Sequence, residues 1–141
     1  MSNTETKSIT VQALINATLD KVWNNWIMTE HITKWNFASL DWHCPIAENN
    51  FVVGGEFHYT MAAKDGSFSF DFWGTYNKIE NEKLIDITLG DGRKMLVEFK
   101  NSDDKTIVTE TFEAEKVNPV EMQQMGWQAI LDNFKKYTES K

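Results

Sequence analysis

The sequence predicts an α+β domain in which an antiparallel sheet packs against a long C-terminal helix. Residues 36–117 consist of short stretches of alternating apolar and polar residues divided by turn sequences, a pattern typical of β-hairpins. Residues 119–139 instead carry apolar side chains three and four positions apart, which is typical of an amphipathic helix. With 141 residues, the chain has the length of one domain with its own core, so we expect a single domain at residues 1–141.

Three short elements are expected before the hairpins. From residue 9 to residue 17 every second residue is apolar, which predicts a strand at residues 8–17. Apolar residues then follow helical spacing at residues 18–27, where Thr18 is suited to be the N-cap. A second short helix is expected at residues 29–35, with Thr29 as its N-cap.

The central part of the chain predicts hairpins. Apolar and polar residues alternate at residues 51–61 and again at residues 68–79, and Asp65–Gly66 between them is a strong hairpin signal. A glycine at position 74 permits a bend or a bulge in the second of these strands. Further polar turns divide the remaining strands, at residues 81–83, 90–93 and 101–105.

The C-terminal helix has a clear predicted start and one unfavourable residue. Asn118 is placed to cap the helix, and Pro119 suits its first position. Gly126 lies in the middle and costs about 1 kcal/mol of helix stability relative to alanine. Two explanations remain open: the glycine allows close approach between helix and sheet, or it leaves empty volume beside Met122, Met125 and Trp127. For Gly126 considered alone we expect the first.

Charge and composition argue against nucleic acids and membranes as binding partners of the chain. The net charge is −7 and basic residues do not cluster beyond pairs, so the sequence predicts no nucleic-acid binding. No apolar run is long enough to span a bilayer, which predicts no membrane insertion. The N-terminal stretch is polar and Cys44 is the single cysteine, so we expect residence in the cytoplasm and no internal disulfide.

Few residues are candidates for chemistry, and the sequence predicts no metal ion, no cofactor and no identifiable catalytic residue. His43 and Cys44 are neighbours, but adjacent side chains on a strand point to opposite faces, so we expect no shared role. His31 and His58 are expected to face solvent. Glu110 shares its parity with apolar residues of its strand, and a buried glutamate is often functional. We favour a bulge or an outward rotation that exposes Glu110.

Four stretches carry a resemblance to a known family. They are ALINATLDKVWNNWIMTEHITKW, VVGGEF, DFWGTYNKI and GWQAILDNF, in this order along most of the chain. The sequence resembles the START-like, or SRPBCC, superfamily, and within it the family related to the C-terminal domain of the activator of the heat-shock-protein-ninety ATPase. The resemblance implies a helix-grip fold: a curved seven-stranded antiparallel sheet wrapped around the C-terminal helix, two short helices between the first two strands, and a cavity between sheet and helix.

The resemblance and the aromatic content of 6 Trp, 9 Phe and 3 Tyr favour a binding module rather than an enzyme. We expect a small hydrophobic ligand, such as a lipid, a polyketide or an aromatic metabolite, in the implied cavity. The residues expected to form its wall are Phe57, Tyr59, Phe70, Phe72, Tyr76, Met122, Met125 and Trp127.

Two alternatives remain open. A cyclase- or hydratase-like enzyme would use the same cavity with an inward acid–base group, for which Glu110, Tyr59 and His43 are candidates. A protein-interaction module, acting as a homodimer or as a chaperone cofactor in the stress response, would need an exposed apolar patch that includes Trp42 or Trp73. The chaperone partner is the weaker expectation, because chaperone activation in the family belongs to longer proteins with an additional N-terminal domain.

Overall fold

The computed structural model describes residues 7–140. Within these residues seven strands form one antiparallel sheet in the order β1-β7-β6-β5-β4-β3-β2. The elements are β1 (Ser8–Ile15), α1 (Leu19–Ile27), α2 (Thr29–Trp35), β2 (Trp42–Asn49), β3 (Glu56–Ala63), β4 (Ser69–Glu80), β5 (Leu84–Leu89), β6 (Lys94–Ser102), β7 (Lys105–Glu113) and α3 (Val120–Glu139). The predicted α+β helix-grip architecture is confirmed, including the two short helices between β1 and β2.

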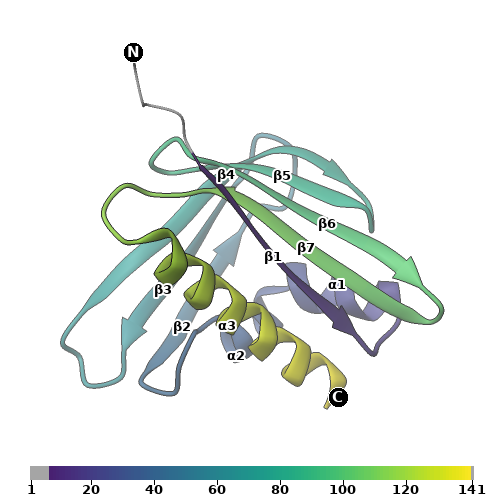
Figure 1. The fold of residues 1–141 in the computed structure, drawn as a ribbon, viewed down its shortest axis with the longest axis horizontal. Helices are drawn as coiled ribbons and strands as arrows, with labels where there is room; N and C mark the ends of the chain where they lie inside the picture. Colours follow the sequence, from purple (N-terminus) through teal and green to yellow (C-terminus); the bar gives the residue numbers. More distant parts are fainter. Residues whose placement is uncertain (1–6, 141) are drawn as a thin grey trace.

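The sheet arches over the last helix, as Figure 1 shows. α3 lies along the edge strand β1, which is its main contact with the sheet, and also touches α1 and α2. None of the helices in residues 7–140 combines the length and the apolar character that a membrane span needs.

Alternation along the strands decides which side chains face inward. Every second residue is buried from Ile9 to Ile15 in β1 and from Thr106 to Phe112 in β7. The pairing of β7 with β1 and with β6 runs in unbroken register, so the inner face of these three strands is regular. The first strand ends at Ile15 rather than at residue 17, because the amide of Ala17 donates back to the carbonyl of Ile15 at 2.9 Å.

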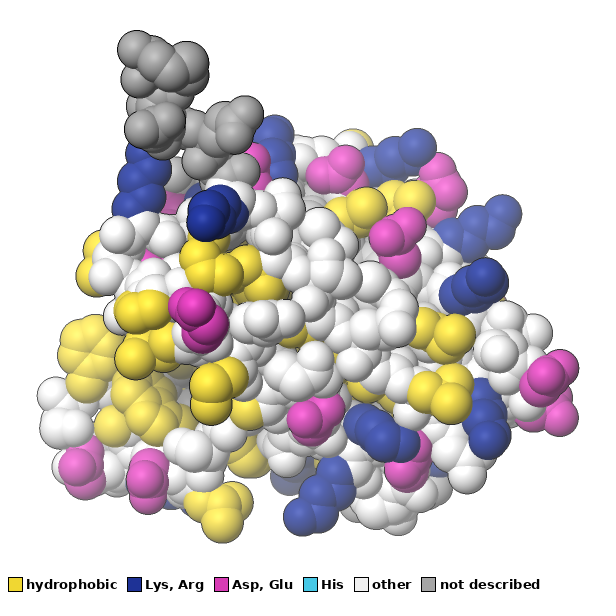
Figure 2. All heavy atoms as spheres, viewed as in Figure 1, with side chains coloured by type: hydrophobic (Ala, Val, Ile, Leu, Met, Phe, Trp, Pro, Cys, Tyr) yellow, Lys and Arg dark blue, Asp and Glu magenta, His cyan; other side chains and the backbone are white. Residues whose placement is uncertain are grey.

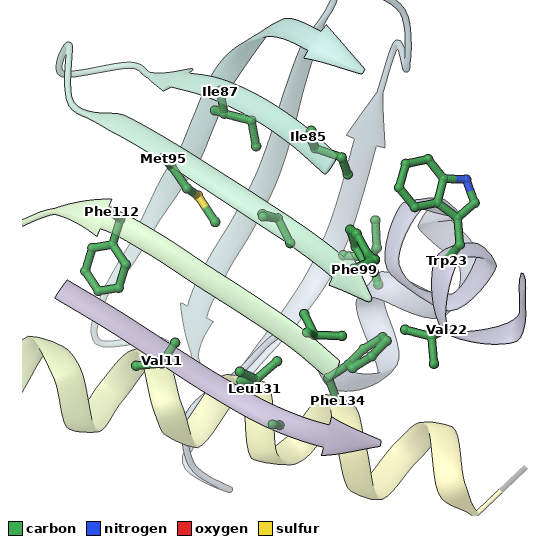
Figure 3. Packing of buried hydrophobic residues seen from close by; sticks show 14 of the residues in the cluster. Val11, Val22, Trp23, Ile85, Ile87, Met95, Phe99, Phe112, Leu131 and Phe134 are labelled. Carbon is green, nitrogen blue, oxygen red and sulfur yellow. The ribbon is translucent and has the colours of Figure 1, made fainter. Parts of the chain in front are cut away.

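The core is solid where α3 meets α1 and α2. The ring of Phe134 meets the rings of Trp26 and Trp35 edge to face, and the ring centroids are 4.8 Å apart in both pairs. Leu131 and Phe134 are completely buried, and Figure 3 shows both beside the β1 strand. This packing fixes the C-terminal half of α3, so any open interior space must lie toward its N-terminal half.

The predicted caps of two helices are wrong by one position. α3 has Pro119 at its N-cap, and Asn118 lies one residue before it. α2 has Met28 at its N-cap, which makes Thr29 its first helical residue. In both helices the carbonyl of the N-cap residue accepts a hydrogen bond from the amide four residues on, which defines where the helix begins.

Gly126 does not bring α3 close to the sheet. A Cβ atom placed on this glycine would meet no neighbouring atom within 4 Å, so the expected close approach is wrong. The reason is angular position: α3 faces the core through Trp127, and the preceding residue is turned about 100° away around the helix axis. Gly126 therefore lies on the flank of the buried face.

Candidate functional site: an apolar pocket

A pocket of about 180 Å³ lies between the inner face of the sheet and the three helices. Inward side chains of β3 to β7 form one side of it, among them Phe57 and Tyr76. Trp26 and Trp35 contribute from α1 and α2, and Trp127 contributes from α3. Aromatic rings therefore face the space from both the sheet and the helices.

Six of the eight residues predicted for the wall line this pocket: Phe57, Tyr59, Phe70, Phe72, Tyr76 and Trp127. The five from the sheet lie on β3 and β4 and share the inward parity that their alternation predicts. Phe57 and Tyr76 are 2% and 3% exposed, so they form the deep part of the wall. Phe70 is 46% exposed, which places it at the mouth.

An aromatic group, here called the aromatic rim, adjoins the mouth and consists of the half-buried Trp42 and the exposed Phe68 and Phe70. Their ring centroids lie 6.1, 6.2 and 5.9 Å from one another. Figure 2 shows hydrophobic side chains gathered at the lower left, over the end of the molecule where Figure 1 places the β3–β4 hairpin. Of the two phenylalanines only Phe70 lines the pocket, so the rim links the interior to the surface.

Met122 and Met125 do not line the pocket, and their predicted place in the wall is wrong. They are 59% and 73% exposed. At 3.6 residues per turn, their side chains point about 140° and 160° away from the direction of Trp127. The buried position in this part of α3 belongs to Gln123, whose side chain accepts from the amide of Glu115 at 2.9 Å and so anchors the loop before the helix.

Several pocket residues were not predicted as wall residues. Two of them are polar, Asn36 and Glu110. The others are aliphatic or aromatic, namely Trp26, Ile27, Trp35, Phe51, Met61, Ile85, Ile87, Met95, Val97 and Ile130. Their inward parity was visible in the sequence, but parity alone does not separate a side chain that fills the core from one that borders an open space. That distinction depends on where α3 crosses the sheet.

Among residues 7–140, Glu110 is the one acidic residue in the pocket wall, and the expectation that it is exposed is wrong. It is 5% exposed, because the regular register of β7 leaves no bulge that would turn it outward. Within residues 7–140 its carboxyl group has no hydrogen-bond or ion-pair partner. Burial alone raises the pKa of Glu110 from its ordinary value of 4.5 to about 8.

Two tyrosines supply the other polar groups on the sheet side of the pocket. Burial raises the pKa of the Tyr59 hydroxyl well above its usual value, and the neighbouring Tyr76 raises it further. Burial also raises the pKa of Tyr76. Both hydroxyls therefore stay neutral hydrogen-bonding groups at physiological pH. Two strands lie between Tyr76 on β4 and Glu110 on β7, and three lie between Tyr59 on β3 and Glu110.

The Cys44 thiol does not have the features of a nucleophile. It is buried, and burial raises the pKa of its thiol to about 11, so the reactive thiolate is scarce at neutral pH. His43, its neighbour, does not line the pocket. Among residues 7–140 no group of three or more His, Cys, Asp or Glu side chains is arranged to hold a metal ion.

The other two histidines have local partners. His31 is half-buried rather than solvent-facing, and its Nδ1 lies 2.7 Å from the Tyr137 hydroxyl. His58 lies on the outer face as expected, between the carboxylates of Glu56 and Asp71. Its ring stacks on Trp73 with a centroid distance of 5.4 Å. Neither histidine contributes to the pocket wall.

The chain is similar to solved structures over nearly its whole length. An AHSA1-like protein from Aeromonas hydrophila is 42% identical, with a TM-score of 0.89, and the match covers 95% of this chain and 93% of that one. Chr148 from Cytophaga hutchinsonii is 50% identical, with a TM-score of 0.82 and coverage of 94% and 92%. CV1439 from Chromobacterium violaceum shares the fold, with a TM-score of 0.84 at 18% identity and coverage of 94% and 98%.

Family membership follows from the sequence as well. No match to this chain was found among the curated proteins. The family model described as "Activator of Hsp90 ATPase homolog 1-like protein" matches residues 16–139, which includes all three helices and all strands from β2 onward. The chain therefore belongs to the family of Activator of Hsp90 ATPase homolog 1-like proteins, within the START-like superfamily.

Proposed function

We propose that this protein binds a small, mostly apolar molecule in the pocket between the sheet and the helices. The observation that carries the proposal is the pocket itself: an interior space of about 180 Å³ whose wall is almost entirely aromatic and aliphatic. Ligand sites typically combine such a wall with a few polar groups that orient the ligand. Here Glu110 and the hydroxyls of Tyr59 and Tyr76 have that position.

The volume supports a ligand of about one aromatic ring. An apolar protein cavity of about 150 Å³ holds one benzene-sized molecule, whereas drug-sized ligands occupy pockets of about 300–1,000 Å³. Of the ligand classes that the sequence predicts, a small aromatic metabolite therefore fits better than a lipid or a polyketide. Met61 and Met95 are flexible wall residues that allow some adjustment to ligand shape.

Adjacent substitutions on β6 provide a sharp test. Val97 is completely buried and lines the pocket, whereas its neighbour Leu96 points to the outer face of the sheet. Val97→Phe therefore fills the interior, and Leu96→Phe adds the same type of ring outside it. The probe is α-methylstyrene, an uncharged single-ring hydrocarbon, titrated into each protein and followed by the amide NMR spectrum.

We expect saturable binding with a Kd at or below about 1 mM in the wild type and in Leu96→Phe, and none in Val97→Phe. Thermal melts establish that each variant is folded. Ile87→Phe fills the same pocket and replaces Val97→Phe if the latter does not fold. Absence of saturable binding to the wild-type protein, or equal binding to the filled variant, would reject the proposal.

A second candidate is a cyclase- or hydratase-like enzyme, which the position of Glu110 favours. A carboxyl group with a pKa of about 8 is suited to proton transfer near neutral pH, provided a substrate proton comes within about 2.6–3.2 Å of it. Exchange of the methyl hydrogens of acetophenone with deuterated water measures this directly. Faster exchange with the wild type than with Glu110→Gln supports catalysis, and equal rates reject it.

A further inference from the structure

We propose that Glu110 selects the ligand by donating a hydrogen bond, as a neutral carboxylic acid, to a carbonyl oxygen on an otherwise apolar molecule. The inference rests on the proposed function, because it specifies the chemistry of the molecule that the pocket takes. It assigns the ligand to the class of small aromatic or aliphatic ketones, aldehydes, esters or amides.

The side chains around Glu110 in the sheet offer its carboxyl group no hydrogen-bond partner. Val11 lies opposite it on β1 and Val97 opposite it on β6, so both neighbouring strands present apolar side chains. Along β7 the next inward residues are Val108 and Phe112, which are also buried and apolar. The carboxyl group borders the pocket, and within residues 7–140 it has no hydrogen-bond partner, so a bound molecule is the remaining partner available to it.

The same surroundings determine the charge of the group. An ionised carboxylate in an apolar space without a partner is far more costly than the neutral acid. In the part of the chain that the structure describes, no positively charged side chain lines the pocket from the sheet or from the helices. The titratable groups that share the wall are Tyr59 and Tyr76, which are neutral. The raised pKa of Glu110, about 8, agrees with a neutral acid at physiological pH.

A neutral carboxylic acid is a hydrogen-bond donor, and this defines what it recognises. A carbonyl oxygen accepts its proton, whereas a hydrocarbon of the same shape leaves the acid unpaired. A carboxylate ligand would bring a second acidic group into the apolar pocket. An amine would bind through the ionised form of Glu110, and its affinity would therefore rise as the pH rises.

The test compares two probes of matched shape. Acetophenone carries a carbonyl oxygen where α-methylstyrene carries a methylene group. Dissociation constants are measured by NMR titration at pH 6 and at pH 9.5 for the wild type, Glu110→Gln and Glu110→Met, with melting curves at each pH. Benzylamine is the cationic probe.

For the wild type at pH 6 we expect acetophenone to bind about three- to tenfold more tightly than α-methylstyrene, which is the ordinary net effect of one hydrogen bond. The preference should disappear at pH 9.5, where Glu110 is ionised. Glu110→Gln keeps an amide donor and should retain a preference that no longer depends on pH. Glu110→Met should show no preference for acetophenone at either pH, because the carbonyl oxygen would then be buried without a donor.

The remaining outcomes show whether the role of Glu110 fails alone or together with the proposed binding function. Equal binding of the two uncharged probes to the wild type at pH 6 overturns the role of Glu110 and leaves the pocket as a binding site. A ketone preference that persists in Glu110→Met also overturns it and points to the tyrosine hydroxyls or to Asn36. At pH 6, where benzylamine is cationic, tighter binding of benzylamine than of acetophenone overturns the neutral form of Glu110. Failure of all probes to bind rejects both proposals.

Discussion

Trp127 of α3 stacks on Phe112 of β7, with ring centroids 3.8 Å apart and ring planes 18° apart. Trp127 also meets Phe72 of β4 edge to face at 5.9 Å. One side chain thus connects the N-terminal half of α3 to two strands on different parts of the sheet. Because Trp127 and Phe72 both line the pocket, the same contacts that hold the helix also set the width of the space beneath it.

Replacing this tryptophan should weaken both stability and binding. Trp127→Ala removes a stacked pair, an edge-to-face pair and part of the pocket wall, so we expect the free energy of unfolding to fall by about 2–4 kcal/mol. Urea denaturation measures the change. Met125→Ala, on the exposed side of the same helix, is the control and should change stability by less than about 0.5 kcal/mol. Comparable losses in the two variants would contradict the role given to Trp127.

The buried carboxyl group should make stability depend on pH. The folded protein keeps the Glu110 proton up to about pH 8, whereas the unfolded chain releases it near the ordinary pKa of 4.5. Between these values the folded state binds more protons, so the free energy of unfolding falls as the pH rises, by at most about 1.4 kcal/mol per pH unit from this group. Urea denaturation at several pH values across this range measures the slope.

The variant Glu110→Gln isolates that contribution. Without a titrating group at this position, the decline between pH 4.5 and pH 8 should become shallower, and the variant should be more stable than the wild type at pH 8. Glu98→Gln removes an exposed carboxylate on the outer face of β6 and should leave the slope unchanged. A wild-type slope that survives in Glu110→Gln would place its origin elsewhere.

The aromatic rim should affect binding through only one of its phenylalanines. Phe70 lines the pocket and Phe68 does not, although both are exposed and their rings are 5.9 Å apart. Phe70→Ala should raise the Kd for α-methylstyrene by about three- to tenfold, since part of the apolar contact is lost. Phe68→Ala should leave the Kd within about a factor of two of the wild-type value.

Sedimentation of the same two variants addresses the predicted homodimer. If the rim is a contact between two copies of the chain, both substitutions should shift the protein toward monomer, because both rings are exposed on that surface. If the rim serves only as the entrance to the pocket, neither substitution should change the sedimentation coefficient. The Kd for α-methylstyrene and the sedimentation coefficient together therefore distinguish a dimer interface at the rim from an entrance to the pocket.

The sequence was sufficient to predict the fold and most of the pocket wall that β3 and β4 contribute. Strand alternation has a period of two, so Phe57, Tyr59, Phe72 and Tyr76 could be assigned to the inner face once the strands were recognised. Glu110 obeyed the same alternation. An exposed Glu110 was favoured because the phase of a strand is uncertain in a single sequence, so a bulge or an outward rotation remained open. The burial of Glu110 is tolerated because a neutral acid bordering an open space costs less than a buried carboxylate.

The helix side of the pocket was harder to predict, because a broad apolar stripe does not reveal which part of it faces inward. Met122 and Met125 extended the stripe of α3 on the flank that the structure leaves in solvent. The side chain on the buried side of this part of α3 is instead the polar Gln123, since its amide group has partners in the loop before the helix. Side-chain hydrogen bonds of this kind cannot be recognised from hydrophobic periodicity.

Two glycines should respond to alanine in opposite directions. Gly126 lies within a helix and an added Cβ would meet no atom within 4 Å, so Gly126→Ala should stabilise the protein by about 0.5–1 kcal/mol through the lower helix propensity of glycine. At Gly74 an added Cβ would lie 2.9 Å from the ring of Phe57 and 2.9 Å from the carbonyl oxygen of Thr88. Gly74→Ala should therefore destabilise the protein by about 1–3 kcal/mol.

Urea denaturation of the two variants measures these changes, and α-methylstyrene titration adds a second readout. Because Phe57 lines the pocket, Gly74→Ala should also weaken binding by pushing that ring toward the ligand space. Gly126→Ala should leave binding unchanged, since Gly126 does not line the pocket. A loss of binding in a stabilised Gly126→Ala protein would mean that the ligand approaches the backbone of α3 at this glycine, which would extend the binding site beyond the pocket wall described above.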